Sequence, residues 1–359
     1  MMQKEYQFPC EKCGAKLHFS ADEGELECSY CLHINKIERA FEQIVEKDYE
    51  ATITKLKVEK KKDVEVTSTK CNACGAVFEL SENIHSALCP YCSSPIVNET
   101  AFYRPIKPQA LLPFKIEKKE ARELFKVWLD GRWFAPNNLK KYASQDGELK
   151  AIYVPYWTYD SDTYSNYRGR RGDKYYVDET YTETVNGQSM TKTRKVQKIR
   201  WHDVSGDLKK HFNDVLIMAT ASLKHSLSHW DLENLVDYNA SYLSGYESEV
   251  YSVELDEGLV SAKSNMDFFI RSSIKSQIGG DVQEIEYLAT DYSNITYKHI
   301  LLPVYASAFK FDGKTYSYVI NARNGDISGD RPYSKVKIAL AVVGVALVIG
   351  GLFYFFGGS

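Results

Sequence analysis

Local catalytic motifs are absent from this sequence. It contains no GxxxxGK[ST] loop, no GxGxxG after a strand-like run, no HExxH and no GxSxG. The sequence therefore lacks the signatures of nucleotide hydrolysis, zinc proteolysis and α/β-hydrolase chemistry. A catalytic triad is a spatial arrangement that needs no local motif, so an unrecognised enzyme or ligand sensor stays open.

An excess of charge of either sign is also absent. The 359 residues carry 45 Lys and Arg against 48 Asp and Glu, a net charge of −3. A chain this close to neutrality has no general attraction for nucleic acid. Its length predicts two to four domains.

Cysteine is missing from residues 93–359, and all eight cysteines lie before that point. A disulfide-stabilised secreted domain would distribute its cysteines through the fold. The first residues, MMQKEYQFPCEKC, also lack the apolar core of a signal peptide. We therefore expect a reducing compartment and thiols that bind metal.

The cysteines form two similar modules, CEKCGA…CSYC and CNACGA…CPYC. Two CxxC pairs joined by a short hairpin supply four thiolates to one tetrahedral zinc ion. The sequence predicts two structural Zn²⁺ ions, with an iron site or a redox dithiol as the alternatives. The predicted ligands are Cys10, Cys13, Cys28 and Cys31 for the first ion, and Cys71, Cys74, Cys89 and Cys92 for the second.

Both modules are poor in bases. The first carries Asp22, Glu23, Glu25 and Glu27 in its hairpin, and residues 71–92 contain no Lys or Arg. Binding to phosphates requires clustered bases. These modules therefore favour docking of a protein or a purely structural role.

The C-terminal segment 338–356, IALAVVGVALVIGGLFYFF, contains no charge. At ~1.5 Å per residue, such a helix approaches the ~30 Å thickness of a bilayer core. Lys335 and Lys337 precede it, and bases mark the cytoplasmic side of a membrane span. We expect a single C-terminal transmembrane helix in the cell membrane, with the N-terminal bulk in the cytoplasm.

The central region predicts an α+β fold with antiparallel sheets. Segments 117–133 and 254–278 have the apolar spacing of helices, and each is followed by residues that alternate as in strands. This order suggests an internal duplication with halves 113–207 and 249–330. The expected organisation is a first zinc ribbon at 1–36, a helical and basic linker at 37–66, a second ribbon at 67–100, the body at 101–334 and the transmembrane helix at 338–356.

Two further helices and the positions of two prolines are also predicted. Helical spacing is expected over 37–56, and residues 212–238 are expected to be helical and partly buried. The prolines in YVPYW and LLPVY cannot donate to a sheet, so we expect them at strand starts or edges.

A polar hairpin is predicted at 173–204, with its turn at Asn186-Gly187. It belongs to the most basic part of the chain and could be a solvated arm or an arm that contacts an acidic partner. Its bases and those just before it are Arg168, Arg170, Arg171, Lys174, Lys192, Arg194, Lys195, Lys198 and Arg200.

Histidine offers one weaker metal hypothesis. His225 and His229 are four residues apart, and Asp231 follows them. On one helix face they could ligate zinc, although a surface or packing role is the more ordinary explanation.

Longer segments resemble a known family. The tandem CxxCGA modules resemble the zinc ribbon of transcription factor IIB. The segments VPYWTYDSDTYSNYRGRRGD and YKHILLPVYASAFKFDGKTYSYVINARNGDISGDRP resemble the body of a YdjG-like bacterial family. Its members join such ribbons to this body and to membrane helices, and are often labelled primosomal helicase-like. The resemblance implies SPFH-domain or phage-shock proteins of membrane stress as partners.

These observations together predict a membrane-anchored, non-catalytic adaptor or scaffold that docks cytosolic or membrane-stress proteins. The helicase label has no support, because no ATPase motif is present. A nucleic-acid-binding membrane protein is the first alternative, and an enzyme or sensor in the body is the second.

Overall fold

The computed structural model describes residues 5–6, 8–39, 44–58, 68–70, 77–79, 84–88, 95–98, 106–136, 139, 149–185 and 188–356. Within these ranges the protein is mostly β-sheet, with four α-helices around it. The expectation of an α+β fold ending in a transmembrane helix therefore needs correction. The long strands dominate because the aromatic and β-branched residues of the body alternate over unusually long distances.

The described N-terminal part contains short elements. They are β1 (Glu5–Tyr6), β2 (Leu17–Ser20), β3 (Glu25–Cys28), β4 (Ile34–Asn35), β5 (Lys47–Asp48), α1 (Tyr49–Val58), β6 (Ser68–Lys70), β7 (Val77–Glu79), β8 (Ile84–Leu88) and β9 (Pro95–Asn98).

The body and the C-terminal part contain longer elements. They are β10 (Ala110–Leu111), α2 (Lys118–Asp130), β11 (Lys150–Val185), β12 (Gln188–Met218), η2 (Leu232–Asn234), β13 (Val236–Asp237), η3 (Ala240–Leu243), β14 (Glu247–Glu249), α4 (Leu255–Ile278), β15 (Val282–Phe311), β16 (Lys314–Asn321), β17 (Ile327–Gly329) and α5 (Lys335–Phe356).

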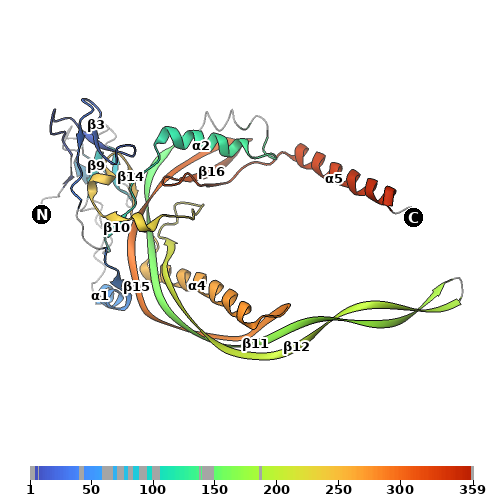
Figure 1. Ribbon diagram of the computed structural model, residues 1–359. Coiled ribbons are helices and arrows are strands. Elements are labelled where there is room, and N and C mark those ends of the chain that lie inside the picture. The colour runs from blue at the N-terminus through green and yellow to red at the C-terminus, as the bar shows by residue number, and fades with distance from the viewer. Residues whose placement is uncertain are drawn as a thin grey trace.

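Two long antiparallel strands, β11 and β15, form the centre of the main sheet. They pair from Lys150↔Ala306 to Gly172↔Val282. β12 continues the sheet beside β11, and β16 continues it beside β15. The sheet is curved, α4 lies on its concave side, and the β11–β12 hairpin projects far beyond that helix (Figure 1).

Helix α4 packs on the sheet through one apolar face. The capping box at its start, in which the Glu254 N–H donates to the Glu257 carboxylate, fixes where the helix begins. Its buried residues recur every three or four positions and meet Trp157, Tyr159 and Tyr297 of the sheet. They are Leu255, Gly258, Leu259, Ala262, Met266, Ile270, Ile274 and Ile278.

In the structure the body has two halves, one from β10 to β12 and one from β14 to β16, and they exchange their first strands. Each half runs in the order short strand, helix, long strand, returning strand. β10 of the first half pairs in parallel with β15 of the second, and β14 of the second half pairs in parallel with β11 of the first. Each short strand thus completes the sheet of the other half.

The helices follow the same exchange. α4 packs on β11 and β12 of the other half and also on β15 of its own. Phe125 of α2 stacks on Tyr318 of β16, with ring centroids 3.7 Å apart. The Ser252 and Val253 N–H groups before α4 donate to the Ala219 carbonyl at the end of β12. The Lys115 and Ile116 N–H groups before α2 donate to the Ala322 carbonyl at the end of β16. That the halves 113–207 and 249–330 arose by duplication stays a prediction, which these matching bonds favour.

The prolines lie inside the central strands and not at their starts. Pro155 is paired with Leu301, and Pro303 with Tyr153. Each nevertheless sits where a neighbouring strand ends, because the Pro155 carbonyl accepts from Ala219 and the Pro303 carbonyl accepts from Ala322. The missing proline N–H therefore falls where the ladder stops on that side.

Two expected helices are corrected. Residues 212–218 belong to β12, where Tyr156 to Ser161 of β11 provide their partners, and the remainder of 212–238 contains only the short η2 and β13. Within the expected helix 37–56, residues 40–43 lie outside the described residues, and among the others the helix begins at Tyr49, after β5 has paired with β15. In both segments, pairing with a strand distant in the sequence outweighs the local helical spacing of apolar residues.

The C-terminal expectation is also wrong. Crossing a bilayer requires about 20 consecutive apolar residues in one helix. Among the residues that the structure describes, no helix is long and apolar enough to cross a membrane. The predicted transmembrane helix at 338–356, and the single-pass cell-membrane location that depended on it, are therefore not supported.

Candidate metal centre

The four cysteines of the first module converge at the end of a small hairpin. β2 and β3 pair with Leu17 opposite Cys28, which brings the second CxxC beside the first. The first knuckle turns through Gly14, whose φ of 70° suits glycine and whose N–H donates to the Cys10 carbonyl. Backbone turns thus aim both pairs of thiols at one point.

The distances between these thiols fit a zinc ion. The Cys10 and Cys31 sulfurs are 3.7 Å apart, and the Cys13 and Cys28 sulfurs are 3.6 Å apart. All four sulfurs lie within 4.8 Å of one another. A tetrahedron with Zn–S bonds of ~2.3 Å has sulfur–sulfur edges of about 3.8 Å. The four cysteines can therefore hold a metal ion.

Backbone donors favour the thiolate form at one of these ligands. The Cys31 N–H lies 3.5 Å from the Cys28 sulfur. Hydrogen bonds from the backbone N–H groups of Cys31 and Tyr30 lower the pKa of the Cys28 thiol to about 6. A lowered thiol pKa suits a metal ligand, because the thiolate is the form that binds.

The second predicted site, Cys71, Cys74, Cys89 and Cys92, lies outside the described residues. Only strands of that module are described. β6 pairs with β7. β8 pairs with β9 of the same module and with β14, which belongs to the body. The described residues therefore contain one cysteine cluster where two ions were expected.

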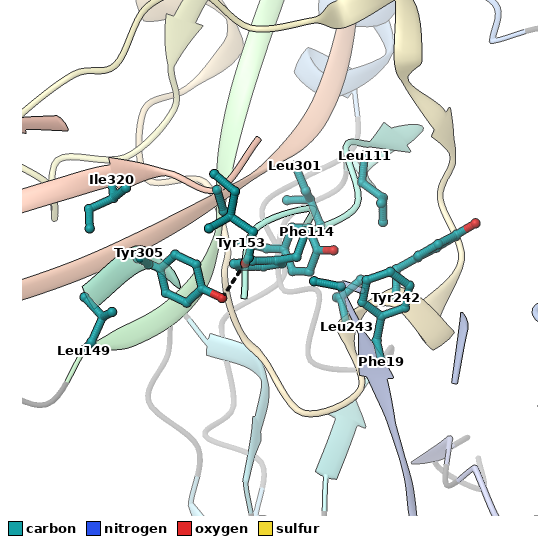
Figure 2. Close-up of a cluster of buried hydrophobic side chains, with 14 of the residues drawn as sticks. Phe19, Leu111, Phe114, Leu149, Tyr153, Tyr242, Leu243, Leu301, Tyr305 and Ile320 are labelled. Carbon is teal, nitrogen blue, oxygen red and sulfur yellow. Dashed lines mark hydrogen bonds between the residues drawn. The ribbon is translucent and has the colours of Figure 1, made fainter. Parts of the chain in front are cut away.

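The first module is attached firmly to the body. The Phe19 N–H donates to the Ser244 carbonyl, and the Ser244 hydroxyl donates to the Leu17 carbonyl. Phe19 is buried against Tyr242, in the same cluster as Phe114 and Tyr305 (Figure 2). The hairpin that carries the metal ligands therefore supplies part of the body's hydrophobic core.

The histidine hypothesis is not supported by the geometry. His225 faces Asp330 at 3.5 Å, and His229 faces Asp326 at 3.2 Å. Asp231 is instead paired with the guanidinium of Arg323, which lowers the pKa of that carboxyl. Each group has a different partner, so the three do not converge.

The predicted basic hairpin forms an arm, which we define as residues 173–185 and 188–200. Beyond Gly172, β11 pairs only with β12 among the described strands, from Asp173↔Arg200 to Val185↔Gln188. At ~3.3 Å per residue the arm reaches about 40 Å. The arm projects freely beyond the sheet (Figure 1).

Three of the six bases of the arm form salt bridges within it. Lys192 pairs with Glu183 at 2.6 Å, and Lys198 pairs with Glu179 at 2.9 Å. Just before the arm, Arg170 is paired with Glu284 and Glu286 of β15. This pairing weakens the attraction to phosphates that the run of bases suggested from the sequence.

The two faces of the arm differ, because residues directly opposite each other share a face. One face carries the ion pairs together with Tyr175 and Tyr181. The other face carries the opposed threonine pairs 180↔193 and 182↔191, and Tyr176 lies there with 66% of its surface exposed.

One polar cluster could not be found from the sequence. Glu46, Asp160, Asp214 and Lys298 meet across β12, β11, β15 and the segment before β5, although they are far apart in the chain. No spacing or motif connects them, since strand pairing alone brings them together.

Comparisons with known proteins give a limited result. No protein-family model matches the chain, and no solved structure matches it. The chain is similar to the uncharacterized protein YdjG of Bacillus subtilis (strain 168), with 23% identity over 347 residues. The similarity covers 96% of this chain and 95% of that protein. The TFIIB-type character of the ribbons stays a prediction.

Proposed function

We propose that this protein is a non-catalytic scaffold that binds a protein partner through the arm. The observation that carries this proposal is the arm itself. It extends about 40 Å past the last residue pair with β15, at ~3.3 Å per residue. An isolated two-stranded hairpin is only marginally stable in water. A projection of this length contributes little to the body's core, which is consistent with a role in contact.

The chemistry of the arm favours a protein over a nucleic acid. Salt bridges within the arm engage three of its six bases. Tyr176, Ile199 and Met190 of the arm are exposed at 66%, 38% and 51%. Exposed tyrosine and apolar side chains are common at the centres of protein interfaces. The partners implied by the family resemblance, SPFH-domain and phage-shock proteins, are the first candidates to test.

The metal centre has a structural role in this proposal. Cys10, Cys13, Cys28 and Cys31 would hold a Zn²⁺ ion with four thiolates, which leaves no open position for a substrate. The ion would fix the hairpin that carries Phe19 into the core. The four cysteines of the second module would hold a second structural ion.

Photo-crosslinking in cells tests the arm directly. A photoreactive amino acid would replace Tyr176 in the arm or, as a matched control, Tyr164 on the same strand and the same face of the sheet. We expect a discrete crosslinked product from position 176 and none from position 164. Equal crosslinking at both positions, or none at position 176, would contradict the proposal.

A further inference from the structure

A connector leads from the first cysteine module to the region of the second, and part of it is docked on β15. We define the connector as residues 44–58. Its β5 segment pairs with β15 at Thr296↔Asp48 and Tyr297↔Lys47. Its helix α1 buries Tyr49 and packs Ile53 and Leu56 against the α4 cluster. The ladder between the connector and the sheet is short, with two residue pairs, and the Tyr297 hydroxyl also donates to Thr52.

A buried lysine completes the attachment. Lys298 of β15 is 7% exposed. Its ammonium lies 2.9 Å from a carboxylate oxygen of Glu46 in the connector and 2.7 Å from one of Asp214 in β12. The Thr296 hydroxyl also donates to Glu46, at 2.9 Å. Glu46 is therefore the charged group by which the connector is held.

A third carboxyl group, that of Asp160, completes the cluster. Asp160 is 5% exposed and lies at an irregularity in the β11 ladder. One of its oxygens accepts from the Asp214 N–H at 2.6 Å, and the other lies 3.3 Å from the Thr296 hydroxyl. Asp214 adopts a φ of 51°, so the backbone turns to make this bond.

The charges of this cluster do not balance when every group is ionised. Three carboxylates would share one ammonium, and unpaired charge is costly away from water. Burial and the neighbouring Glu46 raise the pKa of Asp160 to about 6, and the hydrogen bond with Asp160 lowers the pKa of Glu46 to about 2. The two carboxyl groups thus behave as a pair that shares one proton.

We propose that Glu46, Asp160, Asp214 and Lys298 form a proton-dependent latch. The latch holds the connector on β15 while Asp160 is protonated and weakens when all three carboxylates are charged. Beside the latch, the connector is also held by the β5 pairs, by the Tyr297 hydroxyl that donates to Thr52 and by the Gln109 amide that donates to the Val45 carbonyl. Loss of the latch therefore loosens the connector and leaves the rest of the fold in place.

The sign of the pH dependence follows from these groups. The folded-state pKa of Asp160 is raised above its unfolded value of ~3.9, so its contribution is present below ~4 and lost as pH rises through about 6. The contribution of Glu46 is present above ~4.3 and lost only as pH falls toward about 2. Raising the pH from 5 to 7.5 therefore weakens the latch.

The groups around Asp160 come from three elements. Glu46 faces it from the connector, Asp214 from β12 and Lys298 from β15. The next carboxylate on its own strand, Asp162, is held by His211 at 2.8 Å and by Asn294 at 2.9 Å. Asp162 therefore provides a matched control that also reports any effect of the histidine.

Amide hydrogen exchange in the full-length protein tests the latch. Exchange rates of residues 47–58, corrected for the intrinsic pH dependence, would be compared at pH 5 and pH 7.5. If release returned the Asp160 pKa from about 6 to its ordinary value of ~3.9, protection would fall about tenfold in the unmodified protein, and this is the largest fall expected. Asp160→Asn should abolish that fall, because an amide mimics the neutral acid, and Asp162→Asn should preserve it.

A second variant keeps the test decisive if Asp160→Asn does not fold. Glu46→Gln removes the charge that opposes Asp160, so it should also reduce the fall in protection. The latch is overturned if protection in the unmodified protein is unchanged between pH 5 and pH 7.5. It is equally overturned if Asp160→Asn, or Glu46→Gln where the first variant does not fold, keeps the full fall.

Discussion

At the scale of single residues, the body depends on close approaches between α4 and the sheet. Gly258 faces Trp157 and the Tyr159 hydroxyl, and that hydroxyl donates to the Leu255 carbonyl at 2.6 Å. A Cβ at position 258 would lie 2.9 Å from the Trp157 ring and closer still to Tyr159. Both aromatic rings are fully buried and therefore have little room to move.

Gly258→Ala should consequently destabilise the protein. We expect a net cost of about 1–3 kcal/mol from overpacking, even though alanine favours a helix. Thermal unfolding would show this as a lower Tm. Gly131→Ala at the end of α2 is the control, because its Cβ would meet nothing closer than 3.8 Å, and its Tm should stay close to the original.

The metal ligands give a second prediction at this scale. Cys28→Ser should remove the bound metal and destabilise the body as well as the hairpin, because Phe19 and Leu17 of that hairpin belong to the main core. The expected loss is on the order of several kcal/mol. Metal analysis and thermal unfolding would be measured together, with Ser29→Ala in the same knuckle as the control. Loss of metal without a change in Tm would show that the hairpin's packing does not need the ion.

At the scale of elements, each half of the body anchors the helix lead of the other half. The Trp157 indole N–H of β11 donates to the Val253 carbonyl at 2.9 Å, and the Tyr305 hydroxyl of β15 donates to the Ile116 carbonyl at 2.8 Å. These two bonds occupy matching positions in the exchanged halves. They hold the segments just before α4 and α2.

Tyr305→Phe and Tyr159→Phe test whether such anchors contribute alike. Each removes a hydroxyl that donates to a carbonyl at a helix lead or first turn and leaves that carbonyl without this donor. We expect each to reduce the free energy of unfolding by about 1 kcal/mol. Chemical denaturation would measure it, with Tyr164→Phe on the open face as the control. If either variant left the free energy of unfolding unchanged, apolar packing alone would account for the position of that helix.

The elements also show what the sequence can predict. The amphipathic patterns at 117–133 and 254–278 correctly predicted α2 and α4, and the CxxC pairs correctly predicted that four cysteines would meet. Apolar residues in 212–218 suggested a helix, yet they extend β12, because pairing with β11 outweighs a short local pattern. The Lys298 cluster depends on strands brought together from across the chain, so no local signal could reveal it.

At the scale of the whole molecule, we expect the arm to be separable from the body. In the second half, β15 and β16 close with a tight turn at Asp312-Gly313, where φ is positive at both residues. In the first half, the corresponding strands run on into the arm. The second half of the body therefore shows that the corresponding pair of strands can close without an arm.

An arm-shortened variant should accordingly keep its fold. Replacing residues 174–199 with Asp-Gly leaves Asp173↔Arg200 as the closing pair. Pairs in an antiparallel ladder alternate between two hydrogen-bonding patterns, and Asp173↔Arg200 has the same pattern as Val185↔Gln188 at the natural tip. Two residues separate the strands at the natural tip, so a two-residue turn also fits here. We expect Tm to change by no more than about 2 °C, because few core contacts are lost. A large drop would mean that the arm supports the body.

The most direct measurement of the scaffold proposal is partner recovery with this variant. The partner identified by crosslinking from position 176 would be quantified after co-purification with the original and the arm-shortened protein, at equal abundance of each. We predict that the partner is lost with the arm while metal content and Tm are retained. Full recovery of the partner by the arm-shortened protein would contradict the claim that the arm is the docking element.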